Sequence, residues 1–420
     1  MSKDKQPEIR FPGFTEDWEE RKLDEIFGKI RNAFVGTATP YYVDEGHFYL
    51  ESNNVKDGRI NRNTEVFIND EFYEKQKDKW LHTNDIVMVQ SGHVGHTAVI
   101  PEDLDKTAAH ALIMFSNYKT KTSPFFLNYQ FQTLTAKRKL ENITTGNTIK
   151  HILASEMKKF EVTIPEHVEQ QKIGSFFKQL DDTIALHQRK LDLLKETKKG
   201  FLQKMFPKNG AKVPEIRFPG FTEDWEERKF GETKTYFTDG NYGESYPSSK
   251  DMSDKENGVP FLRGSDFSNG YLDSSNANYI KYEKHQELTS GHIKQDDIVI
   301  AVRGSLGTLG YANKENEGWN INSQLAILRT NKSEILGMFL IQYLLSNKGQ
   351  KEILSRNTGT ALKQLPIKQL KDIPIPMPAI SEQQKIGTFF KQLDDTITLH
   401  QRKLDLLKET KKGFLQKMFV

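Results

Sequence analysis

The sequence predicts an α+β fold in which two similar β-rich domains lie at opposite ends of a long antiparallel two-helix coiled coil, related by a pseudo-two-fold axis. Two internal repeats carry this prediction. Residues 7–22 return unchanged as residues 214–229, and residues 169–206 return as residues 382–419 with two substitutions. The stretches between these constant blocks have diverged, so identical frames hold two different inserts. A segment that must fit its own copy stays identical, whereas segments that differ are expected to contact partners that differ.

The repeats divide the 420 residues into two similar halves. Each half is long enough to bury a core of its own. From the N-terminus, the predicted segments are a flexible start (1–6), the first β-rich domain (7–165), the first helix (166–206), a linker (207–213), the second β-rich domain (214–378) and the second helix (379–420).

Composition limits the class of protein. There is no cysteine, so disulfides and thiolate metal sites are excluded and a reducing cytosol is expected. The first residues lack the apolar core of a signal peptide, and no run approaches the roughly 18 apolar residues of a membrane span. We therefore expect a soluble, cytoplasmic protein. Its net charge of +3 gives little support for a polyanionic partner, so any nucleic-acid contact must be local.

Both constant helices carry a heptad pattern, because their apolar residues recur at alternating spacings of four and three. The pattern runs from Ile173 through Phe201 to Met205 on the first helix, so at 1.5 Å per residue the seam is about 50 Å long. The predicted seam residues are Ile173, Phe177, Leu180, Ile184, His187, Leu191 and Leu194 on the first helix and Ile386, Phe390, Leu393, Ile397, His400, Leu404 and Leu407 on the second. Polar seam positions, which are His187, His400, Lys198 and Lys411, are expected to control register.

The linker decides the direction of the helix pair. Residues 207–213 reach at most roughly 25 Å when extended, which is too short to return the chain along the full helix, so the pair is predicted to be antiparallel with the chain termini close together. Four further leucines, Leu186, Leu193, Leu399 and Leu406, lie off the seam. Either the flank of the neighbouring domain or another subunit must cover them, and the sequence leaves this choice open.

The two inserts are rich in short apolar runs separated by glycine and asparagine turns, which is typical of β-strands. They align in pieces, so they are predicted to share one fold. The aligned pieces are residues 50–60 with 262–272, residues 84–96 with 296–308, and residues 145–150 with 358–363. The extra residues of the second insert fall between residues 229 and 262, as one longer loop.

Polar, glycine-bearing turns in these pieces are the candidate contact sites. Such turns can approach a phosphate or a base edge closely, although a strand-to-strand turn uses the same residues for geometric reasons alone. Where one insert has Glu51 and Gln90, the other has Arg263 and Val302 or Arg303, as expected of two readers with different targets. The candidate DNA-binding residues are Asn53, Lys56, Gln90, Ser91, His93, His96, Asn147 and Lys150 in the first insert and Arg263, Ser265, Arg303, Ser305, Thr360 and Lys363 in the second.

No catalytic or metal-binding constellation is visible. The sequence contains neither a phosphate-cradling loop nor a dinucleotide fingerprint, and it lacks an amino-methyltransferase motif. Triplets of the form E-x-K at Glu156 and Glu196 are expected by chance in charge-rich segments. His93, His96 and His110 have no carboxylate at ligand spacing. We predict no catalytic residue, no bound metal and no cofactor in this chain.

The whole arrangement resembles the specificity subunit of type I restriction-modification systems, in which two target recognition domains are joined by two helical regions. The resemblance covers nearly the whole chain. It is carried by PMPAISEQQKI at residues 376–386, by the matching residues 165–173, by the block PEIRFPGFTEDWEERK, and by the elements DIVMVQSGHVGHTAVI and DIVIAVRGSLGTLGYA. The first element departs from the usual arginine-glycine form, since Ser91 aligns with Arg303.

The resemblance implies a non-catalytic reader of double-stranded DNA. Two modification subunits that methylate adenine with S-adenosylmethionine, and restriction subunits that use ATP and magnesium, are the implied partners. Each domain would read half of a bipartite asymmetric site, and the helices would set the spacer. Half-sites on one face of B-DNA lie about 34 Å apart, which a 50 Å rod can span. A coiled-coil adaptor with two peptide- or glycan-binding domains is the alternative, and a stand-alone nuclease or methyltransferase is a third.

Overall fold

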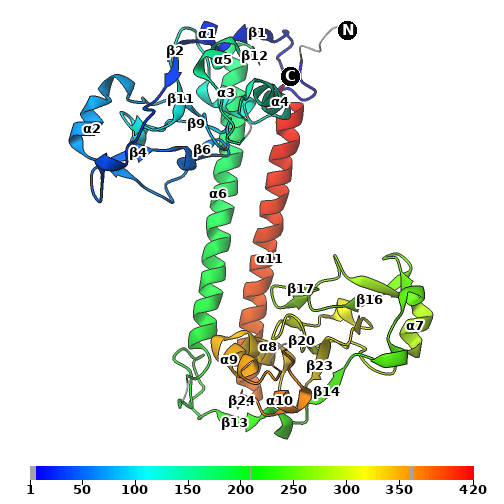
Figure 1. Cartoon of the computed structure of the whole chain (residues 1–420). Helices are drawn as coiled ribbons and strands as arrows, with labels where there is room; N and C mark the ends of the chain where they lie inside the picture. The colour runs from blue at the N-terminus through cyan, green and yellow to red at the C-terminus, as the bar shows by residue number, and fades with distance from the viewer. Residues whose placement is uncertain (1–5, 147, 209, 360–362) are drawn as a thin grey trace. The chain divides into compact units, whose positions relative to one another are not determined.

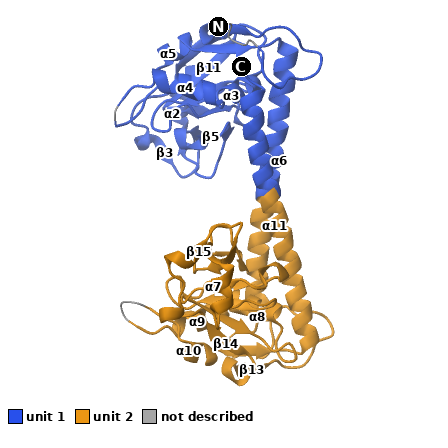
Figure 2. Cartoon of the chain, turned by 90° about the vertical axis from the view of Figure 1, so that its right-hand side faces the viewer, with its two compact units in different colours: residues 1–188, 403–420 blue, residues 189–402 orange. Residues whose placement is uncertain are grey.

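The computed structural model describes residues 6–146, 148–208, 210–359 and 363–420. The chain divides into two compact units, residues 1–188 with 403–420 and residues 189–402 (Figure 2). Two long helices, α6 (His167–Lys204) and α11 (Ile380–Lys417), each belong partly to one unit and partly to the other. Each unit therefore contains one β-rich domain and a pair of helix segments. The predicted α+β class with two repeated domains is confirmed.

The first unit contains twelve strands and five short helices within its described residues (Figure 1). The strands are β1 (Glu19–Lys22), β2 (Phe27–Asn32), β3 (Tyr42–Val43), β4 (His47–Leu50), β5 (Val55–Lys56), β6 (Arg59–Ile60), β7 (Phe67–Ile68), β8 (Ile86–Val89), β9 (Thr97–Val99), β10 (Ala108–Ala109), β11 (Leu112–Tyr118) and β12 (Glu161–Ile164). The helices are α1 (Leu23–Ile26), α2 (Asp70–Lys75), α3 (Pro124–Gln130), α4 (Leu134–Ile143) and α5 (Ala154–Lys159).

An antiparallel sheet in the order β2-β11-β8-β9 forms the centre of this unit. Its strand β8 reads Ile-Val-Met-Val and is buried along its whole length. A second sheet has the order β10-β4-β7-β3, and β5 pairs with β6 in a hairpin. Asp57 (φ 52°) and Gly58 (φ 82°) adopt the left-handed backbone that a two-residue hairpin turn of type I′ requires.

The second unit repeats this plan. Its strands are β13 (Glu226–Lys229), β14 (Tyr236–Asp239), β15 (Met252–Ser253), β16 (Gly258–Leu262), β17 (Phe267–Ser268), β18 (Tyr271–Leu272), β19 (Asn278–Lys281), β20 (Ile298–Ala301), β21 (Leu309–Tyr311), β22 (Asn320–Ile321), β23 (Leu325–Arg329) and β24 (Pro374–Met377). Its short helices are α7 (Tyr282–Glu287), α8 (Gly337–Leu345), α9 (Asn347–Ser355) and α10 (Ile367–Lys371). The predicted common fold of the two inserts is confirmed.

The sheet orders match element by element. In the second unit, β14-β23-β20-β21 takes the place of β2-β11-β8-β9, and the hairpin of β18 and β17 joins this sheet to give six strands. A four-stranded sheet in the order β15-β19-β16-β22 corresponds to β3-β7-β4-β10. The longer loop predicted for the second insert contains two short 3-10 turns, Gly243–Ser245 and Ser249–Asp251.

Helices α6 and α11 run antiparallel within each unit, as predicted. In the first unit, the rings of Phe176 and Phe414 lie 5.2 Å apart, and Asp181, further along α6, meets Lys411, which is earlier on α11. In the second unit, Lys198 meets Asp394, while the ring of Phe201 lies 5.0 Å from that of Phe389. In each unit, moving forward along α6 means moving backward along α11.

The predicted seam is only partly buried. The fully buried seam residues are Ile173, Phe177, Leu191, Ile386, Phe390, Ile397 and Leu404. The partly exposed ones are Leu180, Ile184, His187, Leu194, Leu393, His400 and Leu407. The off-seam leucines Leu186, Leu193, Leu399 and Leu406 are 59%, 67%, 65% and 63% exposed. The neighbouring domains therefore leave these leucines uncovered, which removes the first of the two alternatives left open by the sequence.

The two chain ends meet in the first unit, as predicted from the antiparallel pair. The Ile9 amide donates to the Lys417 carbonyl at 2.9 Å, and the Lys417 ammonium lies 3.3 Å from a Glu8 carboxylate oxygen. The predicted flexible start, residues 1–6, falls outside the described residues except for Gln6. The side chain of Gln6 donates to Asp17 at 2.9 Å.

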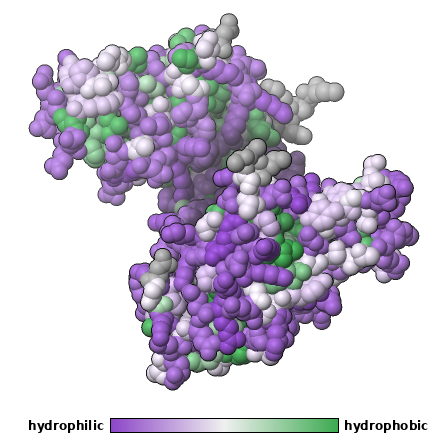
Figure 3. Space-filling model, turned by 60° about the horizontal axis from the view of Figure 1, so that its bottom comes forward, coloured by the Kyte–Doolittle hydropathy of each residue, from purple (hydrophilic) through white to green (hydrophobic). Residues whose placement is uncertain are grey.

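The exposed residues of the described chain are mostly polar. Figure 3 shows a largely hydrophilic face with small apolar patches scattered over it. Among the described residues, no helix is both long and apolar enough to cross a membrane.

Candidate nucleic-acid interface

The turn between β8 and β9 lies against the segment that follows α4. The Gly92 amide donates to the Lys150 carbonyl at 3.1 Å, and the Ile152 amide donates to the Gln90 carbonyl at 2.9 Å. These two hydrogen bonds hold the two segments side by side. The fold therefore brings the predicted contact residues Gln90, Ser91 and Lys150 together at one edge of the first domain.

The β5–β6 hairpin region joins the same edge. His93 Nε2 lies 3.1 Å from the Ser52 carbonyl oxygen, and the Asp57 amide donates to His96 Nδ1 at 3.4 Å. The exposed predicted residues of this region are Asn53 and Lys56. Three segments that are distant in the sequence thus present predicted contact residues from one part of the surface.

A cavity of about 290 Å³ opens beside these segments, with His96, Lys137, Glu141 and Lys150 in its wall. Burial lowers the pKa of His96, an effect that the nearby Asp57 carboxylate opposes. A neutral imidazole has one donor and one acceptor, so His96 can accept the Asp57 amide and still donate to another group. The cavity wall can therefore offer hydrogen-bond donors and acceptors to a base edge, and donors to a phosphate.

The second domain builds the same edge from different side chains. The Leu365 amide donates to the Val302 carbonyl at 2.9 Å, and the Arg303 guanidinium donates to Gln364 Oε1 at 3.3 Å. The turn after β20 therefore lies against the segment after α9. The predicted residues Ser305 and Lys363 are exposed. Asn147 and Thr360, one in each of the two segments, lie outside the described residues.

An aromatic side chain of the longer loop supports Arg303 and was missed by the sequence analysis. Arg303 Nη1 donates to the Tyr242 hydroxyl at 3.1 Å, and the guanidinium carbon lies 5.2 Å from the centre of the Tyr242 ring. Tyr246, on the same loop, is also exposed. The signal was present as the extra length between residues 229 and 262, which brings Tyr242 to the edge that carries Arg303.

The predicted exchange of Glu51 for Arg263 occurs at matching positions, but both side chains have partners inside their own domain. The Tyr42 hydroxyl donates to Glu51 at 2.5 Å, and hydrogen bonding with His110, together with the Tyr42 bond, holds the pKa of Glu51 below its usual value despite burial. Arg263 donates to the buried carboxylate of Asp266 at 3.2 Å. Ser265, next to it, is exposed.

The constant blocks bind each other within each unit, which explains why both are preserved. The Arg10 guanidinium makes two hydrogen bonds, at 2.7 and 2.8 Å, to the buried carboxylate of Glu169 at the start of α6. Arg217 repeats these bonds on Glu382 at 2.7 and 2.8 Å. The block PEIRFPGF is therefore attached to the first turn of the helix of its own half.

The residue after each glutamate holds the β-rich domain on the helix. Gln170 accepts the Ser123 amide at 3.0 Å and donates to the Pro165 carbonyl at 2.8 Å, so it joins the start of α3 to the start of α6. Gln383 accepts the Leu336 amide at 2.9 Å in the second unit. The sequence pattern marked these residues as constant without revealing what they bind.

Comparison with known proteins identifies the class. The family model for the type I restriction modification DNA specificity domain matches residues 15–196 and again residues 222–409. A protein of Methanocaldococcus jannaschii, described as the specificity subunit of restriction enzyme MjaX, is 27% identical over 412 residues, covering 95% of this chain and 92% of the relative.

Solved structures share the fold. The crystal structure of a type I restriction-modification S subunit from M. genitalium has a TM-score of 0.66 at 17% identity and covers 99% of both chains. A structure described as the basis of complex assembly and conformational transition of the type I R-M system has a TM-score of 0.50 at 18% identity, covering 97% of this chain and 98% of its own.

The chain carries two DNA specificity domains on two constant helices and belongs to the type I restriction modification DNA specificity domain family. It is a specificity subunit of a type I restriction-modification system, with the DNA-recognition role that this class has. The adaptor alternative finds no support in these comparisons.

Proposed function

We propose that each β-rich domain reads one half of a bipartite, asymmetric DNA site and that the two helices set the unread spacer between the halves. One observation supports this most directly. The two recognition edges are built from equivalent turns on nearly identical helices, yet Gln90 and Ser91 of the first occupy the places of Val302 and Arg303 in the second. Equivalent geometry with unlike side chains suits two readers of unlike sequences.

The side chains suggest different readouts for the two halves. An arginine such as Arg303 can donate two hydrogen bonds to one guanine, whereas a glutamine such as Gln90 matches the donor and acceptor of adenine. Lys56, Lys150 and Lys363 are exposed around the two edges and can contact phosphates without reading sequence. Because the net charge is only +3, partner subunits are expected to supply much of the phosphate contact.

The proposal includes partners that perform the chemistry. Two modification subunits would hold S-adenosylmethionine and methylate adenine, and restriction subunits, bound through them, would use ATP and magnesium to cut DNA. The specificity chain itself would bind no cofactor and catalyse no step. The relative described for complex assembly of a type I system supports such an association.

Exchange of one domain tests the reading of half-sites. Residues 23–165 are replaced by the corresponding stretch of another specificity subunit, and the complex with modification subunits is assayed by sequencing methylated DNA. One half of the methylated sequence should change and the other should remain. A change in both halves would contradict independent reading. The double variant S175T/A185T, which gives residues 169–206 the sequence of residues 382–419, is the control and should leave both halves unchanged.

A second experiment tests the proposed absence of catalysis. The purified chain alone is incubated with DNA, magnesium and a labelled methyl donor. We expect neither methyl transfer nor cleavage, and the complex with modification subunits serves as the positive control for methylation. Turnover by the chain alone would favour a stand-alone enzyme.

A further inference from the structure

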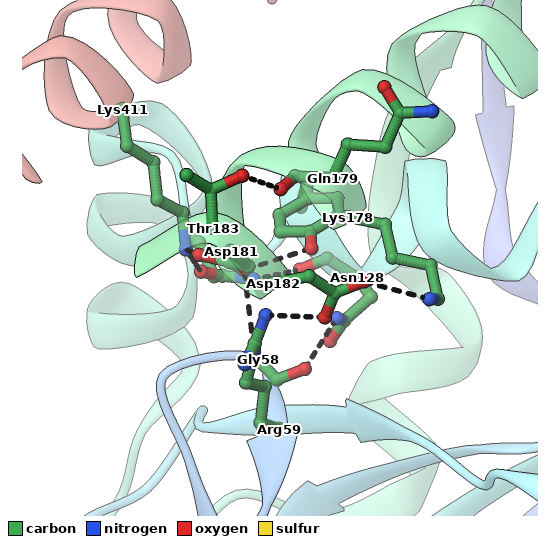
Figure 4. Close-up of polar contacts among 11 residues, drawn as sticks. Gly58, Arg59, Asn128, Lys178, Gln179, Asp181, Asp182, Thr183 and Lys411 are labelled. Carbon is green, nitrogen blue, oxygen red and sulfur yellow. Dashed lines mark hydrogen bonds and ion pairs between the residues drawn. The ribbon is translucent and has the colours of Figure 1, made fainter. Parts of the chain in front are cut away.

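A buried aspartate on α6 joins the helix pair to the first recognition domain. Asp181 is 5% exposed, and its carboxylate is reached from three directions. The Lys411 ammonium of α11 lies 2.8 Å from Oδ1, and the Tyr129 hydroxyl of α3 donates to Oδ2 at 2.9 Å. The Arg59 guanidinium approaches Oδ2 at 3.8 Å, and Figure 4 shows Arg59 and Lys411 reaching Asp181 from different sides.

The same cluster holds the β5–β6 hairpin. Arg59, on β6, donates to Asp182 at 3.1 Å, so the hairpin contacts two neighbouring carboxylates of α6. The Gly58 carbonyl, at the hairpin turn, accepts a hydrogen bond from Asn128 of α3 at 2.9 Å (Figure 4). This hairpin carries Lys56 and contacts the turn that contains His96. The recognition edge is therefore attached to the helix pair through a few directional contacts.

The second unit repeats the constant part of this cluster. Asp394 of α11 is 5% exposed, and the Lys198 ammonium of α6 lies 2.6 Å from it. The Tyr271 hydroxyl, on hairpin strand β18, donates to Asp394 at 3.3 Å. Burial raises the pKa of Asp394, the Lys198 ammonium opposes this rise, and hydrogen bonds from Tyr271 and Gln342 oppose it further.

The domain residues that meet the constant pair differ between the two units. The hairpin position holds Arg59 in the first unit and Tyr271 in the second, and the helix position holds Tyr129 on α3 and Gln342 on α8. The aspartate and lysine of the helices do not change. The two diverged domains therefore contact the same helix aspartate with different side chains. This indicates that the contact between domain and helix is kept while the domain residue that makes it varies.

We propose that the pairs Asp181–Lys411 and Asp394–Lys198 are positioning sites that fix the hairpins β5–β6 and β17–β18 on the helix pair and thereby fix the length of the unread spacer. This inference rests on the proposed function. A buried carboxylate left without donors is costly, so it is satisfied only when the hairpin, the short helix and the facing long helix take one relative position. Apolar packing alone is non-directional and tolerates small shifts.

The spacer length accepted by the complex tests this inference. The variant Asp394→Asn has nearly the same shape but no charge for Lys198, and Tyr271→Phe removes a single hydroxyl. The full complex with modification subunits is assayed for methylation of sites whose spacer is native, one base pair shorter or one base pair longer. We expect the preference for the native spacer to fall roughly tenfold in Asp394→Asn, and less in Tyr271→Phe.

The control is Asp395→Asn, because Asp395 is exposed and pairs only with Lys391, on its own helix, at 2.7 Å among the ion pairs of the described residues. It should keep the native spacer preference. The equivalent variant Asp181→Asn should reproduce the effect of Asp394→Asn.

An unchanged spacer preference in Asp394→Asn and Tyr271→Phe would overturn the positioning role, even if both variants unfold at lower temperature. If Asp394→Asn does not fold, the result for Tyr271→Phe decides. A wild-type complex with no preferred bipartite sequence would instead contradict the proposed function, so the two failures are distinguishable.

Discussion

Two buried glutamates attach the constant blocks of each half to their helix, and they do so with unequal numbers of bonds. Glu382 accepts two hydrogen bonds from Arg217 and a third from the Trp225 indole at 3.1 Å. Glu169 accepts its charged bonds from Arg10. Breaking a buried pair leaves an unpaired charge, so these carboxylates affect stability more strongly than exposed ones.

The variant Glu382→Gln should destabilise the second unit by on the order of 3 kcal/mol, because Arg217 then keeps its charge without a counter-charge. Urea unfolding, followed by tryptophan fluorescence, measures the loss. Arg228→Gln is the control, since the Arg228–Glu226 pair is exposed and contributes less than about 1 kcal/mol. Equal losses of unfolding free energy in the two variants would show that the buried Arg217–Glu382 pair stabilises the protein no more than an exposed pair does.

Equivalent aspartates at the start of the central strands have different surroundings. Asp297 is bound by Arg329 at 2.7 Å. In the first unit, β11 carries Ser116 at the place of Arg329, and the Asp85 carboxylate accepts only the His82 amide, at 2.8 Å, among the hydrogen bonds of the described residues. Burial raises the pKa of Asp85 to about 6, and the His82 hydrogen bond opposes the rise.

This raised pKa predicts a pH-dependent stability in the first unit. The folded state binds the Asp85 proton more tightly than the unfolded state, so the contribution is full below pH about 4 and is lost as the pH rises through about 6. At 1.36 kcal/mol per pKa unit the loss approaches about 3 kcal/mol. Urea unfolding of wild type and Asp85→Asn at pH 4.5 and 7.5 measures it.

We expect Asp85→Asn to keep the accepted His82 amide and to remove this part of the pH dependence. The difference between the two proteins isolates Asp85 from the other titrating groups. The same pH slope in both would show that Asp85 titrates normally in the folded chain.

At the scale of elements, the long helices combine a buried seam with an exposed stripe. Seven of the fourteen predicted seam residues are fully buried, and four off-seam leucines are exposed. Within each unit, each long helix packs both against the other long helix and against the β-rich domain. Phe177 of α6 and Phe390 of α11, for example, each belong to the core cluster of their own domain. A change in helix length is therefore expected to preserve each domain as long as these ends are retained.

Removal of one heptad from each helix should change the spacer. Deleting residues 189–195 of α6 and 395–401 of α11, which face each other within the second unit, shortens each helix by about 10 Å. The methylated site should lose roughly three base pairs of spacer at 3.4 Å per base pair. Sequencing of methylated DNA reads this directly. An unchanged spacer would contradict the role of the helices in setting its length.

The sequence predicted the elements better than the contacts between them. Repeats, heptad spacing and linker length were sufficient to predict the class of fold and the direction of the helices, because each of these signals can be read directly from the sequence. The bond from Arg10 to Glu169 joins residues 159 positions apart, and no local pattern reveals it. Likewise, Tyr242 supports Arg303 only because the fold returns the longer loop to the recognition edge.

For the whole molecule, the meeting of the two chain ends in the first unit is the main result of antiparallel helices. The Ile9 amide and the Lys417 carbonyl are joined directly, so the first unit contains both the beginning and the end of the chain. The linker that follows α6 belongs to the second unit and connects the first half of the chain to the second. New termini placed in this linker should leave both β-rich domains intact.

A circular permutant tests this consequence. Val420 is joined to Met1 by a short linker, and the chain is opened at Asn209, which lies outside the described residues. The permutant should form the complex with modification subunits as the natural chain does, measured by size-exclusion chromatography and methylation of the same site. A chain that folds but no longer assembles would argue against the predicted neighbourhood of the ends in the functional complex.

The aromatic core of the first unit has a consequence for synthesis. The ring of Phe419 lies 6.2 Å from that of Trp18, 5.3 Å from that of Phe126 and 5.8 Å from that of Phe177, so a core that includes Trp18 also needs Phe419. The domain made first by the ribosome thus lacks part of its core until Phe419, after the end of α11, has been made. A chain that stops before Phe419 would expose this core, which makes it recognisable to chaperones and proteases before it could occupy a place in a complex.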